Sequence, residues 1–464
     1  MMTGEQYRRS LRDSREIYYQ GKRVDDITVH PDMSRVVDLV ASGYDRWYQP
    51  GNSEHPMMTP PRSVDQMRER IPIFDTIDVL TDATYQCIAT LVTAAGRLRE
   101  ENPEIADRVL AYVDGARAAD IRITECITDA KGDRTLKPSA QEDPDQYLHV
   151  VRRTDGGVII RGAKLHISGA SFGHDLMVIP TKRMSHGEDE YSIACMVPVN
   201  SPGVQIVNVG VSPKTDDARD QPASWDNAIF DGFVIFNDVF VPTERILLDG
   251  KPELAAIFAH SLGLWLRLGG VTKLADQADE VVGLAHLIAE ANGLAKVSHV
   301  REKIDELAIH ATMLRAGLEA AVSNAHATAE GYYYPDELYT NAAKYHGATA
   351  YGTMIRHLLD IAGGSVVTVP AMADFDNPDV GASLRKYMST SSSVDGEYRA
   401  RLFATIRNIT SDDFGGWRLV AMLQSGGGLY AQRIVARGKY NFEAARQRAL
   451  RTAGLENYKP PQPG

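Results

Sequence analysis

Short strand-like runs separated by turn-forming residues occupy the middle of the chain, from about residue 140 to 250. They include YLHVVRR (147–153), GVIIRGAKLHIS (157–168) and FDGFVIFNDVFVP (230–242), and breakers such as NSPG stand between them. Helical periodicity dominates on both sides of this region. After it, Ile304, Leu307, Ala311, Leu314 and Leu318 form an apolar stripe at spacings of 3 and 4. A small β-domain between two helical regions is therefore expected.

This order predicts a mainly α fold with a central antiparallel β-domain. We place an N-terminal helical domain at residues 1–138 and the β-domain at residues 139–255. The remaining residues, 256–464, are expected to form a C-terminal helical bundle and a tail, because long helices with short connections pack side by side.

Charge and cysteine content narrow the classes of function. The chain has 50 basic and 61 acidic side chains, a net charge of −11, and no basic stripe. This balance argues against nucleic acid and against an anionic membrane surface as partners. Three scattered cysteines do not form a disulfide framework, and the charged N-terminus has no signal peptide pattern. We also see no run of 18 apolar residues, so we expect no membrane span and a cytoplasmic location.

Several motifs point to one family. They are TDAKGDR (128–134), DPDQYLHVVRRTDGGVIIRGAKLHISGA (143–170), ADFDNPDVGASLRKY (373–387), SDDFGGW (411–417) and GGGLYAQRI (426–434). With these motifs the chain resembles the 4-hydroxyphenylacetate 3-monooxygenase / 4-hydroxybutyryl-CoA dehydratase family over nearly its whole length. The resemblance implies an acyl-CoA dehydrogenase-like fold, FAD as cofactor and a homotetramer that shares flavin sites between subunits.

The resemblance also implies which residues hold the flavin. In this fold the strand that here contains Ile167 and Ser168 runs beside the flavin ring, and the Ser168 hydroxyl can bond a ring heteroatom such as N5. Small residues after Ser168 let the backbone approach a flat cofactor. The plainer alternative is an ordinary strand and turn.

Two further segments are cofactor candidates. The loop with Lys131, Asp133 and Arg134 matches the family's flavin loop, and Arg134 can pair with a pyrophosphate or an acidic substrate group. Gly415 and Gly416 would let a C-terminal segment press on cofactor or substrate. The alternatives are a solvated turn for the loop and a helix cap for the glycines.

The dehydratase branch of the family carries an iron–sulfur cluster. The resemblance implies two close cysteines in the first helical domain, then a histidine and a cysteine at the start of the third. Cys87 has no second cysteine three or four residues away, and no cysteine follows Cys195. A [4Fe–4S] cluster needs about four ligands, so we expect no cluster and no other metal.

The hydroxylase branch uses an Arg-x-x-x-Tyr pair and a histidine before the flavin loop. Here Tyr85 matches the tyrosine, but Thr81 stands in place of the arginine and Glu125 near the place of the histidine. Tyr85 can donate a hydrogen bond, and a desolvated Glu125 can serve as general acid or base. A packing tyrosine and a surface glutamate are the alternatives.

Two other residues are candidates for the reaction site. His166, within the flavin strand, can stack on the ring or relay a proton near neutral pH; a satisfied half-buried histidine is the alternative. Arg267 begins the third domain and can replace the missing arginine charge. Without that arginine, a neutral or carrier-bound substrate is easier to accommodate than a small anionic phenol.

The function predicted is a two-component flavin-dependent monooxygenase, which uses reduced FAD and O2 to hydroxylate a phenolic or electron-rich aromatic substrate. A separate flavin reductase is expected, because no GxGxxG nicotinamide fingerprint follows a strand. The main rival is a cluster-free dehydratase or isomerase, and a non-catalytic flavin binder is the third possibility.

Overall fold

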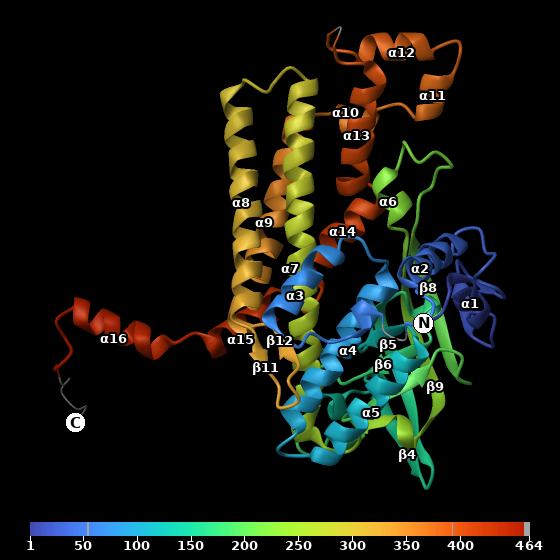
Figure 1. The fold of residues 1–464 in the computed structure, drawn as a ribbon, viewed down its shortest axis with the longest axis vertical. Helices are drawn as coiled ribbons and strands as arrows, with labels where there is room; N and C mark the ends of the chain where they lie inside the picture. Colours follow the sequence, from blue (N-terminus) through green and yellow to red (C-terminus); the bar gives the residue numbers. More distant parts are fainter. Residues whose placement is uncertain (53–54, 392, 459–464) are drawn as a thin grey trace.

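The structure is a computed structural model, and it describes residues 1–52, 55–391 and 393–458. Long helices of the C-terminal half stand side by side as a bundle, and the β-sheets lie against its lower part (Figure 1). The helices are α1 (Gly4–Ser10), α2 (Ser34–Trp47), α3 (Val64–Arg70), α4 (Val79–Leu98), α5 (Pro103–Ala119), α6 (Pro222–Asp226), α7 (Pro252–Ala291), α8 (Ser298–Ser323), α9 (Glu337–Ala362), α10 (Ser365–Thr368), α11 (Met372–Asp376), α12 (Gly381–Met388), α13 (Gly396–Thr410), α14 (Asp413–Gln424), α15 (Leu429–Lys439) and α16 (Phe442–Thr452).

Two sheets make up the β-region. The strands are β1 (Glu16–Tyr19), β2 (Lys22–Val24), β3 (Ile123–Cys126), β4 (His149–Thr154), β5 (Gly157–Ser168), β6 (Asp175–Val178), β7 (Ala194–Pro198), β8 (Val204–Val211), β9 (Ile229–Pro242), β10 (Ile246–Leu248), β11 (His326–Ala327) and β12 (Tyr333–Tyr334). Among the described residues, one sheet has the order β2-β1-β8-β9-β5-β4 and the other β10-β7-β6-β3, while β11 and β12 form a separate hairpin.

The predicted fold class is confirmed, with one refinement of the central sheets. Most neighbouring strands are antiparallel, but β1 runs parallel to β8 and β3 runs parallel to β6. Both parallel strands come from the first section of the chain, which the sequence predicts as mostly helical. They are only four residues long, too short for an alternating pattern to be recognised.

The helix α7 forms the centre of the bundle and packs on α4, α8 and α9. By length and hydropathy it would suffice to cross a membrane, but 78% of its most apolar stretch is buried inside the protein. A helix that is apolar all round belongs in a core, so α7 is a core helix here.

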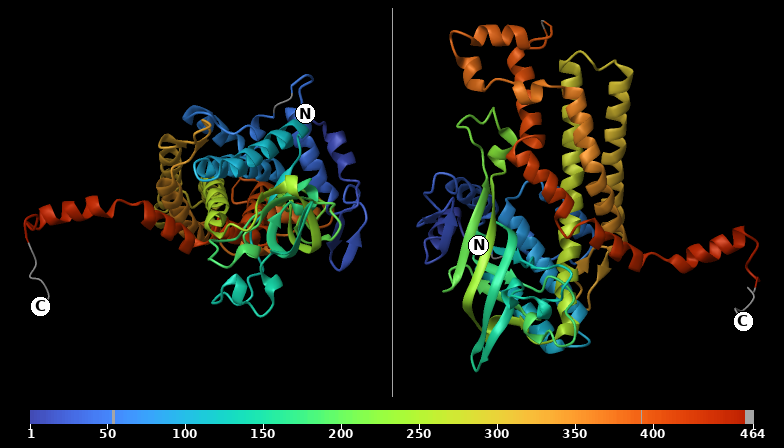
Figure 2. Two further views of the ribbon diagram at one scale, coloured as in Figure 1. Left: turned by 90° about the horizontal axis from the view of Figure 1, so that it is seen from below. Right: turned by 180° about the vertical axis from the view of Figure 1, so that it is seen from behind.

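The helix α4 lies between the sheets and α7 and is buried along nearly its whole length (Figure 2). Its N-cap is Asp78, whose carboxylate accepts hydrogen bonds from the backbone of Leu80 and Thr81 at 3.0 and 2.9 Å. One face of α4 packs against β3, and another, with Asp82 and Gln86, faces the space between the sheets and the bundle.

Candidate functional site

A cleft of about 2260 Å³ separates the β-region from the helical bundle. Its walls are α4, β3, the end of β5, the loop 127–134, α7, α14 and α15. Candidate residues from all three predicted domains line it: Glu125, Lys131, Arg134, His166, Ile167, Ser168, Arg267 and Gly416. The cleft therefore brings these candidates together from distant parts of the sequence.

Glu125 is a titratable group of the cleft whose pKa is raised. It lies on β3, and burial together with the nearby Asp82 raises the pKa of its carboxyl to about 8, although Lys273 lowers it. The Asp82 carboxylate is held in position, because it pairs with Lys273 and accepts a hydrogen bond of 2.6 Å from Gln86. A carboxyl with a pKa near neutrality can both take and give a proton under ordinary conditions.

Because the pKa of Glu125 is raised, the stability of the folded protein should depend on pH. The pKa of Glu125 rises from 4.5, the value for a free side chain, to about 8 in the folded protein. The folded state binds this proton more tightly, so the stabilisation is complete below about pH 4.5 and is lost as the pH rises through 8. We expect the wild-type Tm to fall more steeply between pH 6 and 9 than that of Glu125→Gln. Equal slopes in a thermal melt series would contradict the raised pKa.

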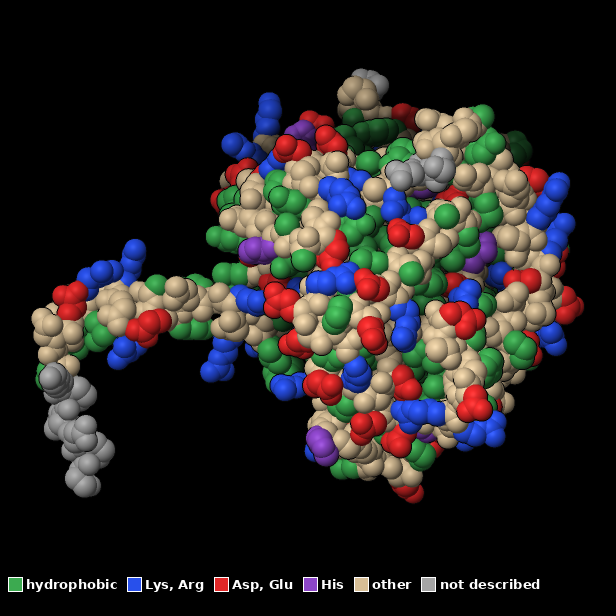
Figure 3. Space-filling model, turned by 60° about the horizontal axis from the view of Figure 1, so that its bottom comes forward, with side chains coloured by type: hydrophobic (Ala, Val, Ile, Leu, Met, Phe, Trp, Pro, Cys, Tyr) green, Lys and Arg blue, Asp and Glu red, His purple; other side chains and the backbone are tan. Residues whose placement is uncertain are grey.

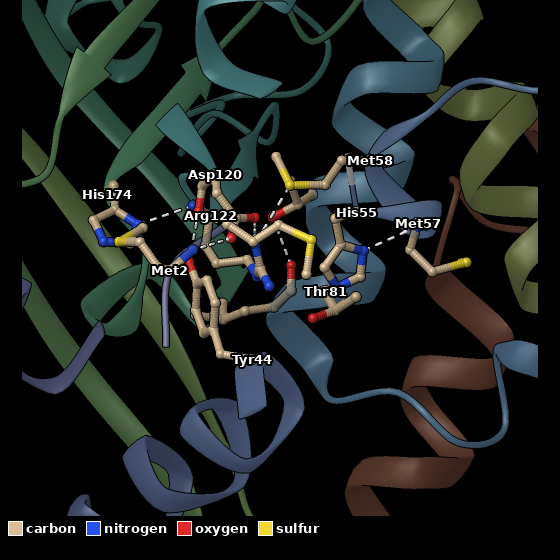
Figure 4. Close-up of polar contacts among 12 residues, drawn as sticks. Met2, Tyr44, His55, Met57, Met58, Thr81, Asp120, Arg122 and His174 are labelled. Carbon is tan, nitrogen blue, oxygen red and sulfur yellow. Dashed lines mark hydrogen bonds and ion pairs between the residues drawn. The ribbon is translucent and has the colours of Figure 1, made fainter. Parts of the chain in front are cut away.

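A buried arginine fixes the start of the strand that carries Glu125. Arg122 is fully buried; its guanidinium lies 3.8 Å from the centre of the Tyr44 ring and 3.1 Å from Asp120 Oδ1. Its backbone N–H donates to His174 Nδ1 at 2.9 Å. Figure 4 shows His174 and His55 on opposite sides of this arginine. The cluster ties β3 to α2 and α5, which gives Glu125 a rigid base.

His166 lies in an irregular part of β5. Its φ is 62°, and the pairing of β5 with β9 shifts register between Lys164 and Ile167. A positive φ in a residue other than glycine is sparsely populated and costs on the order of 1–3 kcal/mol, and such bulges redirect side chains. The His166 side chain is exposed in the cleft rather than packed in the sheet.

Ser168 belongs to a hydrogen-bonded chain that was not foreseen. Its hydroxyl donates to Asp231 Oδ1 at 2.5 Å, and the Trp417 indole N–H donates to Asp231 Oδ2 at 2.8 Å. Asp231 and Trp417 both line the cleft. The DDFGGW segment is thereby attached to the sheet beside the strand that the resemblance assigns to the flavin ring.

The loop 127–134 gives the cleft a basic rim. Lys131 and Arg134 line it together with Lys182 and Arg183, and none of the four makes an ion pair with any described residue. Burial and the neighbouring Arg134 lower the pKa of Lys131. Asp133 instead lies outside the cleft lining, where it is exposed and accepts two hydrogen bonds from Thr135.

A buried ion pair, which the sequence did not predict, attaches this loop to β5. Lys164 Nζ lies 2.7 Å from Asp129 Oδ1 and donates to the carbonyl oxygens of Ile127 and Ile179 at 3.0 Å each. Both side chains are 2% exposed. The Asp129 carboxylate also accepts from Thr181 and from the backbone of Leu148, so every polar atom of the pair is satisfied.

Arg267 reaches the cleft from α7. Its Nε donates to the carbonyl oxygen of Gly426 at 2.8 Å, and burial lowers its pKa to about 10, which leaves it charged at neutral pH. Gly426 has a φ of 74°, and a Cβ there would lie 2.8 Å from Arg267 Cγ. The glycine turn before α15 therefore packs directly against the Arg267 side chain, with no room for a Cβ at Gly426.

Of the remaining candidates, Gly416 lines the cleft, and Tyr85 and Gly415 do not. Tyr85 packs edge-on against Phe74 and Trp265 with ring centroids 5.4 and 5.8 Å away, outside the cleft lining. Gly416 lines the cleft, whereas a Cβ on Gly415 would meet the backbone of Thr410 at 2.5 Å. Both glycines lie in the first turn of α14, at its N-terminus rather than at a C-cap. The functional roles assigned to these three residues stay predictions.

The cysteines are distributed over three elements. Cys87 lies on α4, Cys126 on β3 and Cys195 on β7, and all three are free and buried. Burial raises the pKa of each thiol, that of Cys195 to about 12. Within the described ranges, no group of three or more His, Cys, Asp or Glu is arranged to hold a metal ion.

Comparisons with known proteins agree with these observations. The family model for the 4-hydroxyphenylacetate 3-hydroxylase N-terminal part matches residues 3–248, and the model for its C-terminal part matches residues 256–454. The chain is 26% identical to the 4-hydroxybutyryl-CoA dehydratase/vinylacetyl-CoA-Delta-isomerase of Clostridium aminobutyricum, over 98% of this chain and all of that protein. It is 25% identical to the 4-hydroxyphenylacetate 3-monooxygenase oxygenase component of Geobacillus sp. (strain PA-9), over 89% and 88% of the two chains.

Solved structures show the same fold. An oxygen-tolerant 4-hydroxybutyryl-CoA dehydratase from N. maritimus matches with a TM-score of 0.87 and 24% identity, over 100% of this chain and 97% of that one. The oxygenase component of 4-hydroxyphenylacetate 3-monooxygenase, complexed with FAD, matches with a TM-score of 0.86 and 23% identity, over 99% and 100%. With family models spanning both halves of its sequence, the chain belongs to the 4-hydroxyphenylacetate 3-hydroxylase family.

Proposed function

We propose that the protein is the oxygenase component of a two-component, FAD-dependent monooxygenase that hydroxylates a phenolic substrate. The observation that carries this proposal is the cleft between the sheets and the bundle, which is lined by Glu125 together with Ser168 and Arg134. Relatives described as oxygenase components, and one described as FADH(2)-dependent, support the proposal. Reduced FAD would come from a separate reductase.

The residues of the cleft fit such a cofactor. The basic rim of Lys131 and Arg134 offers unpaired charges for a pyrophosphate, and the irregular end of β5 presents backbone and the Ser168 hydroxyl to a flat ring. When bound, reduced flavin with O2 supplies the oxygen atom that is transferred. Trp417, held by Asp231, lines the cleft beside Ser168, where an aromatic side chain would help to exclude water from the reaction.

The protein's own acid–base chemistry centres on Glu125. We assign to its carboxylate the removal of the phenolic proton, because a phenolate is the more electron-rich substrate. His166, exposed in the same cleft, is placed to exchange protons with solvent or to lie against a ring. Arg267 supplies a fixed positive charge from the opposite wall.

The positions of the cysteines favour oxygenation over cluster-dependent dehydration. Cys87 lies in a different apolar core cluster from Cys126 and Cys195, and each thiol is enclosed by hydrophobic side chains. Such thiols are kept protonated, whereas cluster ligands are thiolates. A cluster-free dehydratase or isomerase remains the second candidate, because the dehydratase relative matches along its entire length.

Isotope labelling distinguishes the two functions. The purified protein is supplied with FAD, a flavin reductase, NADH and ¹⁸O2, together with 4-hydroxyphenylacetate or its neutral amide. We expect one ¹⁸O atom in a hydroxylated product, with faster turnover of the neutral amide. If 4-hydroxybutyryl-CoA loses water instead and no phenol gains ¹⁸O, the second candidate replaces the first.

The Asp231 hydrogen bonds predict a specific binding defect. In Asp231→Asn the Trp417 N–H and the Ser168 hydroxyl lose a charged acceptor, which is worth about 1.5–3 kcal/mol for hydrogen bonds to charged groups. We expect FAD to bind about tenfold more weakly in a fluorescence titration. Trp417→Phe, which removes one of the two bonds but keeps an aromatic ring, should show a smaller loss. Unchanged FAD affinity in both variants would separate α14 from the cofactor site.

A further inference from the structure

Two histidines from neighbouring helices of the bundle are in contact. The helices α8 and α9 lie side by side (Figure 1). His310 on α8 and His346 on α9 have ring centroids 5.5 Å apart, and their ring planes are tilted by 41°. Neither residue lines the cleft. The pair is therefore a feature of the bundle that the proposed reaction does not use.

Close packing of α8 and α9 brings the two rings together. A Cβ at Gly347 would lie 2.6 Å from Leu314 Cδ2, so the missing side chain lets α9 approach α8 closely. Gly347 follows His346 directly, and Leu314 stands four residues after His310, on the same face of α8. Side chains on facing helices of a bundle are a common source of metal ligands.

Each ring has a buried nitrogen that has no hydrogen-bond partner among the described residues. These two atoms are His310 Nδ1 and His346 Nε2. Buried polar atoms in folded proteins are nearly always paired, because an unpaired one is destabilising. His174 shows the usual arrangement: its ring nitrogens bond Ser10 Oγ at 2.8 Å and the backbone N–H of Arg122 at 2.9 Å. The contacting pair on α8 and α9 therefore lacks a partner that is not part of the described chain.

A metal ion is a partner that can satisfy both imidazoles at once. A neutral imidazole has one nitrogen with a free lone pair, and metal ions bind that nitrogen. Two imidazoles that bind one tetrahedral ion at about 2.0–2.1 Å have ring centroids roughly 5 Å apart, close to the 5.5 Å observed here. Imidazole ligands suit Zn²⁺, Cu²⁺ and Ni²⁺. The separation of the rings and the chemistry of their free nitrogens thus agree with a transition-metal ion.

We propose that His310 Nδ1 and His346 Nε2 bind one divalent transition-metal ion, which clamps α8 to α9. Both side chains are half-buried, so water can complete the coordination of the ion, as it does in open zinc sites. Glu306, one helical turn before His310, adds a negative charge near the ion while its Oε2 pairs with His357 Nε2 at 2.9 Å. The site is separate from the cleft, and the proposal is independent of the reaction catalysed.

Isolated surface histidines are weaker competitors for the ion. On the face shown in Figure 3, histidines appear as separate purple patches among acidic, basic and apolar side chains. A histidine that already has a protein partner, such as His326 with Asp336 at 3.1 Å, must give up that partner to bind an ion. A lone imidazole offers one ligand, whereas the pair on α8 and α9 offers two at a fixed separation, which raises the affinity through effective concentration.

Metal titrations of the full-length chain test the site. Protein freed of metal with a chelator is titrated with ZnCl2 in a calorimeter, as wild type and as His310→Gln, His346→Gln and His299→Gln. His299 is the matched control, because it is an exposed histidine at the start of α8. We expect one strong site per chain in wild type and in the control. Binding should be at least about tenfold weaker in the other two variants, because each loses one of the two ligands.

Two further measurements identify the clamp. Zn²⁺ at about a hundredfold its Kd should raise the Tm of wild type by about 3 °C and that of His310→Gln by much less. Electron paramagnetic resonance of wild type loaded with one Cu²⁺ should show two imidazole nitrogens bound to the ion. This spectrum needs no substitution, so it tests the site even where a variant fails to fold.

Three results would overturn the proposal. Lack of saturable binding of both Zn²⁺ and Cu²⁺ at concentrations up to about 100 μM would leave no site. Equal Zn²⁺ affinity in wild type, His310→Gln and His346→Gln would place the ion elsewhere. A Cu²⁺ spectrum with a single imidazole nitrogen would exclude an ion shared by the two helices.

Discussion

Replacement of Glu125 by glutamine is expected to lower kcat by about 10²–10⁴-fold, the usual contribution of a general acid or base. The amide keeps the shape of the carboxyl, so the cleft and the contacts of β3 are preserved, but an amide cannot take a proton. The pH profile of wild-type kcat should also show a limb that rises through an apparent pKa near 8. Glu125 acts as a carboxylate, and burial and Asp82 raise its pKa to about that value. This limb should be absent from the residual activity of Glu125→Gln.

Controls separate proton transfer from structural damage. Glu244→Gln makes the same change at an exposed residue outside the lining of the cleft and should leave kcat unchanged. FAD affinity at pH 6 should be alike for Glu125→Gln and wild type, because Glu125 is protonated in the folded protein at that pH. The two Tm values should converge only near pH 4.5, where the unfolded wild type is protonated as well. If Glu125→Gln retains more than about a tenth of wild-type kcat, another group moves the proton.

Except for Asp133, the candidates predicted from strand and loop patterns line the cleft, because a motif fixes the backbone that carries them. Ile167 and Ser168 were predicted from the strand that the resemblance assigns to the flavin, and Arg134 from the TDAKGDR loop; all three line the cleft. Tyr85 shows the limit of this reasoning on a helix. It is adjacent to Gln86, which lines the cleft, but successive helical residues point about 100° apart. Tyr85 consequently faces Phe74 and Trp265.

Pairings between distant segments were not accessible from the sequence. Asp231 and Trp417 are 186 positions apart, and nothing in either local pattern identifies the other as a partner. Lys164 and Asp129 each lie within a recognised motif, yet the motifs give no sign that the two charges are buried together. Such contacts depend on how β5, β6 and the loop meet in three dimensions. The bulge at His166 likewise results from the pairing of β5 with β9.

Loss of the Lys164 charge on β5 is expected to be the most destabilising single change where β5 meets the loop that borders the cleft. Lys164→Met removes the cation but keeps most of the volume, which leaves the Asp129 carboxylate and two carbonyl oxygens buried without their donor. Breaking a buried pair in this way costs about 3–5 kcal/mol. We expect a loss of that size in the free energy of unfolding, measured by urea denaturation.

The double variant Lys164→Met/Asp129→Leu shows whether the cost comes from the unpaired charge. If it does, the double variant should be more stable than Lys164→Met, because an apolar pair leaves no buried ion. Recovery will be partial, since Thr181 and the Leu148 N–H lose the Asp129 carboxylate that accepts from them. A loss below about 1 kcal/mol in Lys164→Met would mean that water reaches the pair. FAD affinity should fall in both variants, because each frees the loop that carries Lys131 and Arg134 from β5.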